Sequence, residues 1–219
     1  MAIPTHLEMV NEVLVRLREN EVSAVTDNKY SKMISKFIND SKRQVEDAYD
    51  WNALTETLTA TTTADLFSYV LEGSGIRFRV IDVLNSTKNY VMKYEATKRM
   101  DEYFLAANPA KGSPVNYNFN GTDPDTGDTL VDFYPIPDGT YNIRLNIIKT
   151  QDNLVANSDK PLVPAEPIIL GAYARALAER GEDGGLASSE AYQLFKSSLA
   201  DYIAIEANHY PEELQWYGN

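Results

Sequence analysis

The residues that could carry chemistry are few and widely separated. The chain has no cysteine and only two histidines, His6 and His209, which lie near opposite ends of the sequence. A zinc site would therefore need carboxylates from distant segments. The densest group of possible ligands, Asp123, Asp125 and Asp128 in GTDPDTGD, resembles a calcium loop but lacks its glycine and terminal glutamate at the required offsets. Because aspartate and glycine also suit a hairpin tip, we predict a turn and no metal site.

Catalytic signatures are also missing from the sequence. It contains no phosphate-binding glycine loop, no nucleophile elbow and no metalloprotease helix. The pairs Glu182 with Asp183 and Glu212 with Glu213 could supply an acid and a base, but adjacent side chains point apart. We therefore predict no catalytic residue, no cofactor and a protein that is not an enzyme.

A basic stripe is the most distinct charge pattern. Lys29, Lys32, Lys36 and Arg43 fall within about 60° of one another on a helical wheel, away from the apolar face of the same segment. Such a stripe is often only a solvated face. In a chain with a formal charge of −12, it is also a natural docking surface for an acidic neighbour. We predict that these four residues bind a partner.

Apolar residues near the C-terminus add a second candidate docking surface. Leu194 and Ile205 lie on one meridian of the last predicted helix, outside its main apolar face, where they would suit a subunit contact. Leu214, Trp216 and Tyr217 follow within a short segment after Pro211, which ends that helix. Tryptophan and tyrosine dominate binding hot spots. The segment is expected to be an arm that binds a partner or, equally, to fold back on its own helices.

Four amphipathic or apolar helices must position these residues. Thr5 followed by Glu8 is a capping box, and apolar residues recur at helical spacing behind it. A longer helix is expected to begin after Thr26 or Asp27 and to end near Trp51. Two further helices are predicted in the second half of the chain, at about 167–180 and 188–210.

The middle of the chain has the composition of strands. Threonine-rich, β-branched and aromatic runs alternate with turn sequences, and a short helix is expected at 99–107. In the last run Tyr141, Ile143, Leu145 and Ile147 alternate with polar residues, as in a half-buried antiparallel strand. The predicted strands lie at 55–63, 66–71, 76–84, 89–95, 115–119, 130–135 and 140–148, about eight in all once irregular runs are divided.

This order of elements predicts an α+β fold in which a four-helix bundle is made from both chain ends and an antiparallel β domain is inserted between its halves. The expected division of the chain is a helical bundle at 1–53 plus 163–210, a β domain at 54–150, a linker at 151–162 and a C-terminal arm at 211–219.

Composition and charge exclude several function classes. The 219 residues include 32 acidic and 20 basic side chains, a balance that disfavours a surface gripping phosphates but permits a wall along which DNA slides. The first ten residues have neither a basic run nor a long apolar stretch, so we expect no signal peptide, no membrane span and synthesis in the cytoplasm.

Three segments resemble a known family. The run DFYPIPDGTYNIRLNII at 132–148 is similar to phage head-tail connector proteins, as are Gly112, Pro114 and Tyr117 upstream and the helix ILGAYARALAERGED at 169–183. The order of elements over about 5–210 resembles tail tubular protein A and related adaptors of podophages. These motifs are structural, so the resemblance transfers no catalytic residue.

The resemblance implies a virion protein of the neck or tail. It implies a homo-oligomeric ring of about twelve copies, a dodecamer, beneath the portal protein, with a tail or nozzle protein on the other side and DNA passing through the lumen unbound during ejection. Two alternatives stay open. One is another neck protein, for head closure or tail completion, and the other is a tail-borne hydrolase.

Overall fold

The computed structural model describes residues 3–181 and 185–209, with side chains described as far as residue 208. The chain divides into two compact units. A helical unit contains residues 1–53 and 151–219, and a β unit contains residues 54–150. The helical unit is therefore built from two segments that are distant in sequence, whereas the β unit is one continuous stretch.

The helical unit begins with α1 (His6–Arg16), whose predicted cap is confirmed. Thr5 accepts a hydrogen bond from the Glu8 amide, and the Glu8 side chain accepts one from the Thr5 amide. The next helix, α2 (Lys29–Ala48), is capped by Asn28 and not by the predicted Thr26 or Asp27. Asp27 is not available as a cap, because its carboxylate already accepts the backbone amides of Ser23 and Ala24.

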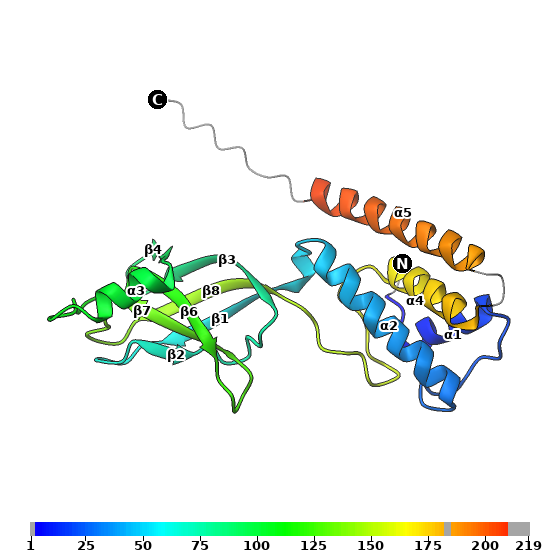
Figure 1. Ribbon diagram of the computed structural model, residues 1–219, viewed down its shortest axis with the longest axis horizontal. Coiled ribbons are helices and arrows are strands. Elements are labelled where there is room, and N and C mark those ends of the chain that lie inside the picture. Colours follow the sequence, from blue (N-terminus) through cyan, green and yellow to red (C-terminus); the bar gives the residue numbers. More distant parts are fainter. Residues whose placement is uncertain (1–2, 182–184, 210–219) are drawn as a thin grey trace, which may run out of the picture. The chain divides into compact units, whose positions relative to one another are not determined.

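The second pair of helices comprises α4 (Ala165–Arg180) and α5 (Leu186–His209). Figure 1 shows α4 between α5 and α2, and α4 also contacts α1. Close approach depends on Gly171. A Cβ atom at that position would lie 2.9 Å from Ser41 Oγ on α2 and 3.2 Å from Phe195 Cδ2 on α5. The helices are thus arranged around α4, and these contacts alone do not establish the closed four-helix bundle that we predicted.

A segment of extended chain, residues 151–162, belongs to the helical unit and is hydrogen-bonded along α1 and α2. Asn39 donates to the Leu154 carbonyl and accepts from its amide, at 3.0 and 2.7 Å. The His6 amide donates to the Asp159 carbonyl at 2.7 Å. Asn157 accepts the Val25 amide at 3.0 Å. We call this segment the strap.

The strap begins at a buried ion pair. Lys42 and Glu46 are each 1% exposed, and Lys42 Nζ lies 2.8 Å from Glu46 Oε1 and 2.8 Å from the Gln151 carbonyl oxygen. Burial raises the pKa of Glu46, while the Lys42 ammonium and the Gln151 backbone amide oppose that rise. The pair therefore fixes the point where the chain re-enters the helical unit.

The β unit contains two four-stranded sheets. The first has the order β1-β8-β3-β4 and is antiparallel throughout. The second has the order β2-β7-β6-β5, in which β5 pairs with β6 in parallel. The bounds of the elements are β1 (Thr55–Thr61), β2 (Ser68–Val70), β3 (Phe78–Asn85), β4 (Tyr90–Val91), β5 (Lys93–Tyr94), β6 (Asn116–Thr122), β7 (Thr129–Tyr134) and β8 (Asn142–Lys149), with the helix α3 (Thr97–Phe104) and a short 3-10 helix η1 (Asn52–Leu54).

The core of the β unit draws on both sheets. Val131 and Phe133 of β7 are fully buried, as are the alternating residues Ile143, Leu145 and Ile147 of β8. The alternation predicted for this last strand is confirmed. The α+β class is also confirmed, with eight strands and five α-helices in the described chain.

Candidate functional site

The predicted basic stripe lies on α2 and is exposed. Lys29, Lys32 and Lys36 are all exposed, and none of the three has an ion pair within the described part of the chain. The fourth predicted member, Arg43, is also exposed but is already engaged. Its guanidinium lies 3.9 Å from Asp40 and 3.4 Å from Asn153. The three lysines therefore carry the unpaired positive charge, and we call them the lysine stripe.

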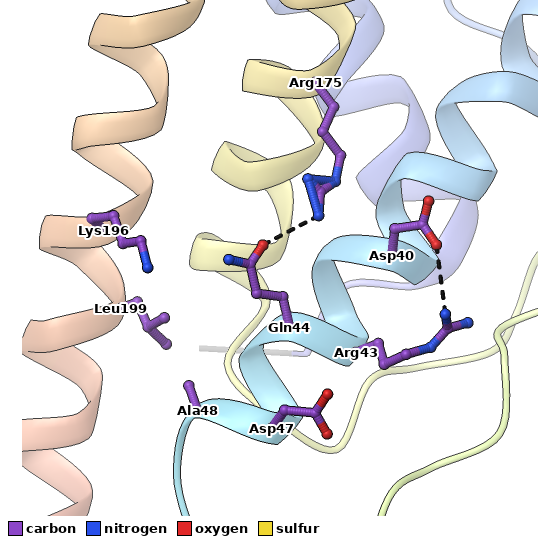
Figure 2. A pocket seen from close by; sticks show the side chains of 8 residues that line it. All are labelled: Asp40, Arg43, Gln44, Asp47, Ala48, Arg175, Lys196 and Leu199. Atoms are coloured by element: carbon purple, nitrogen blue, oxygen red, sulfur yellow. Dashed lines mark hydrogen bonds and ion pairs between the residues drawn. The ribbon is translucent and has the colours of Figure 1, made fainter.

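Arg43 lines a groove formed by three helices, which we call the mixed-charge groove. Figure 2 shows Lys196 and Leu199 on α5 facing residues of α2, with Arg175 reaching Gln44 from α4. The groove has a volume of about 560 Å³. Its lining is Asp40, Arg43, Gln44, Asp47, Ala48, Arg175, Lys196 and Leu199.

The mixed-charge groove contains three cations, Arg43, Arg175 and Lys196, and two anions, Asp40 and Asp47. Arg175 donates to Gln44 Oε1 at 3.2 Å, and the Lys196 ammonium lies 5.6 Å from the centre of the Tyr192 ring. The sequence analysis named Arg43 but missed Arg175 and Lys196. The pattern within one helix cannot show a groove built by three, because each cation taken alone is an ordinary surface residue.

A second groove in the same unit has the opposite character, and we call it the acidic groove. It has a volume of about 660 Å³. Its lining is Ile3, Pro4, Glu8, Glu12, Arg16, Trp51, Ala53, Leu162, Val163, Pro164, Ala165, Glu166, Ile169, Tyr202 and Glu206. The groove thus combines four glutamates and one arginine with several apolar residues. That arginine is already paired, because Arg16 Nε lies 3.1 Å from Glu12.

Local hydrogen bonds position three glutamates of the acidic groove and favour the ionised form of Glu8. The Thr5 amide donates to Glu8, which lowers the pKa of that carboxyl. The Tyr202 hydroxyl donates to Glu166 at 3.0 Å, and the Asn52 amide donates to Glu206 at 3.0 Å. Sequence analysis missed this groove, because its glutamates come from three helices.

The predicted apolar contacts have mixed outcomes. Leu194 and Ile205 on α5 are each 60% exposed, so both are available to a partner. Leu214, Trp216 and Tyr217 lie outside the described residues. Exposure alone does not show a contact, so all five stay predictions as partner-binding residues.

Two of the three candidate metal ligands, Asp123 and Asp128, accept hydrogen bonds from backbone amides. Asp123 accepts the Asp125 amide at 3.1 Å, and Asp128 accepts the amides of Gly73 and Gly75 at 3.0 and 2.8 Å. Within the described residues no three histidine, aspartate or glutamate side chains are grouped so as to hold a metal ion. His6 is buried against Ser35, with 3.0 Å between Nε2 and Oγ. The side chain of His209 lies outside the described part.

Comparison with known families identifies the group to which the chain belongs. The family model described as SU10 adaptor protein matches residues 4–214, which include both units. The chain belongs to the SU10 adaptor protein family. No match is found among curated proteins.

Family membership makes this chain a phage adaptor, a structural component of the virion neck that associates with other neck components. Adaptor families of this kind are typically non-enzymatic. Within residues 3–181 and 185–209, no helix is both long and apolar enough to cross a membrane.

Proposed function

We propose that this SU10-family adaptor forms a ring of about twelve copies beneath the portal, joins the capsid to the tail, and lines the channel through which DNA leaves. In this respect it would work like tail tubular protein A. The observation that carries the proposal is the family match over residues 4–214, because it includes both the helical and the β unit.

The charge of the chain supports a role in lining the channel. Each copy has a formal charge of −12, so a ring of copies is strongly negative before counterions are counted. Phosphates are repelled by such a wall, and DNA can slide along it without binding. The proposed ring therefore binds protein partners and leaves DNA unbound.

The docking residues of the ring are proposed from exposure and charge. The lysine stripe is exposed and has no ion pair among the described residues, Arg43 lines the mixed-charge groove, and Leu194 and Ile205 are exposed on α5. The C-terminal arm with Leu214, Trp216 and Tyr217 is proposed to bind the portal or an adjacent subunit. We expect the free protein to be a monomer or weak oligomer and the portal to concentrate it into a ring.

Negative-stain electron microscopy of the purified protein, alone and mixed with the portal of the same phage, tests this proposal. Rings of about twelve copies on the portal are expected, and they should weaken as salt is raised. A portal that stays bare at low salt and micromolar adaptor would rule the proposal out. A peptidoglycan zymogram, expected to be blank, separates the adaptor from a tail-borne hydrolase.

A further inference from the structure

The helical unit carries two surfaces of opposite charge. The lysine stripe lies on the first half of α2, and its three ammonium groups have no ion pair within the described chain. The acidic groove has four carboxylates, of which only Glu12 is ion-paired within the same part of the chain. Complementary charge of this kind attracts one surface to the other when geometry allows.

The stripe cannot reach the far end of the groove of its own chain. Lys29 begins α2 and Ala48 ends it, and a helix rises about 1.5 Å per residue, so the two are about 28 Å apart. Glu206 lies beyond the Ala48 end, because it accepts the Asn52 amide. An extended lysine side chain spans only about 6 Å. Lys29 and Glu206 can therefore meet only between copies.

From this arrangement we infer that the acidic groove is the seat for the lysine stripe of a second copy of this chain. The inference rests on the proposed ring and specifies its subunit contact. Each copy would offer its stripe to one neighbour and its groove to the other. A contact between two different surfaces is heterologous, and such contacts close into rings when the rotation between copies allows.

The apolar part of the acidic groove also suits lysine. Ile3 and Leu162 line the groove while 52% and 51% exposed, so both have apolar surface still to cover. Lysine buries its methylene stem on apolar surface while its ammonium stays near water or a carboxylate. A lysine row can thus cover these side chains and neutralise the glutamates beside them.

The chain's own C-terminal segment is a poorer occupant on charge. Residues 211–219 contain Glu212 and Glu213 and no lysine or arginine. Placing this segment among four glutamates would add like charge, which costs free energy. Charge therefore favours the stripe of a second copy.

Zero-length carbodiimide cross-linking tests the contact directly, because it joins a lysine to a carboxylate only where the two touch. An equal mixture of ¹⁴N- and ¹⁵N-labelled full-length chains is cross-linked at high concentration and low salt, then digested for mass spectrometry. We expect links of mixed isotope between Lys29 or Lys32 and Glu206 or Glu166. The exposed ion pair of Lys111 with Asp65 is an internal control that should link within one chain.

Charge reversal supplies the second arm. Lys29→Glu, Lys32→Glu and Lys36→Glu together should reduce self-association, measured by sedimentation, roughly tenfold, because three surface pairs are lost. Glu166→Lys with Glu206→Lys should have a similar effect, and a mixture of the two variants should associate again. Thermal melts confirm that each variant is folded, and Glu166→Gln with Glu206→Gln is a milder version that keeps hydrogen-bond acceptors.

A matched control reverses three exposed lysines of the β unit, Lys88, Lys93 and Lys98, with the same change in net charge. It should associate as the unmodified chain does. If the chain self-associates in sedimentation but no stripe-to-groove link forms, this inference is wrong, whereas the proposed ring is not contradicted. Links from the groove to portal lysines instead would also overturn it. If the chain forms no ring even on the portal, the proposed function fails first.

Discussion

The two units of this adaptor differ in which parts of the chain form them. The β unit is one continuous stretch, and its core joins both sheets through residues of that stretch alone. The helical unit joins residues 1–53 to residues that follow the whole β unit, through packing of α1 and α2 against α4 and through polar bonds from α1 and α2 to the strap. The helical unit thus depends on contacts between segments that are distant in the chain, and the β unit on contacts within one stretch.

The largest expected effect comes from separating the segments. Residues 54–150 alone should fold, whereas a chain ending at residue 150 should keep the β unit and lose the helical one, because α1 and α2 lack α4 to cover their apolar faces. Circular dichroism and amide NMR of the two fragments measure this. If the 54–150 fragment is unfolded, the β unit does not fold from its own stretch of chain and the contrast between the two units is wrong.

The buried ion pair should give the next largest effect. Lys42→Ala leaves Glu46 buried without its partner and frees the Gln151 carbonyl, so it should cost about 3 to 5 kcal/mol of unfolding free energy. Chemical denaturation, followed by a signal from the helical unit, measures the loss. The matched variant in the β unit, Lys111→Ala, breaks an exposed pair and should cost at most about 1 kcal/mol.

A paired replacement separates the charge effect from the packing effect. Lys42→Met together with Glu46→Leu removes both charges, and it should recover most of the stability lost by Lys42→Ala. If the paired replacement is as unstable as the single one, the contribution of the pair lies in its bonds to the strap and not in charge compensation.

Gly171→Ala should destabilise the helical unit less than Lys42→Ala does. The added methyl group would meet Ser41 and Phe195 at distances that force α2 or α5 to shift, so we expect a loss of about 1 to 3 kcal/mol. Gly139→Ala in the β unit is the control, because no atom lies within 4 Å of the new methyl group. Equal thermal midpoints for the two variants would show that α4 is not tightly packed.

Acid should weaken the helical unit first. Burial lowers the pKa of His6, with the backbone of Ala156 and the carboxylate of Asp159 opposing this. The unfolded chain therefore takes up a proton on His6 more readily than the folded chain does. The contribution of His6 to the free energy of unfolding is complete above about pH 6.5 and falls as the pH drops below that value, by at most about 1.4 kcal/mol per pH unit. Melts of the helical unit at pH 7.5 and 5.5 measure this, and His6→Gln should reduce the difference.

Local patterns predicted the elements well. The Thr5 and Glu8 capping box and the alternation from Ile143 to Ile147 are features of adjacent residues, and both are confirmed. The cap of α2 was wrong because Asp27 is used by an upstream turn. The spacing of Lys42 and Glu46 on one helix suggests an ordinary surface pair, but the pair is buried and Lys42 also donates to the Gln151 carbonyl at the start of the strap.

The docking surfaces show the same limit. Exposed lysines on one helix could be found from periodicity, since a single element carries them. The acidic groove draws on α1, the end of the strap, α4 and α5, so no pattern within one segment contains it. What sequence periodicity cannot supply is the set of side chains that distant segments bring to one place.

Helix α4 contributes to both grooves, with Glu166 and Ile169 in the acidic groove and Arg175 in the mixed-charge groove. Helix α4 packs against α1, α2 and α5, and a closely packed interior transmits strain, so a small displacement at one end of α4 is expected to reach its other end. Seating a neighbour against Glu166 should therefore alter the spacing of Arg175 from α2 and α5. In a ring built through the acidic groove, a neighbour seated on one copy would thus change the mixed-charge groove of that same copy.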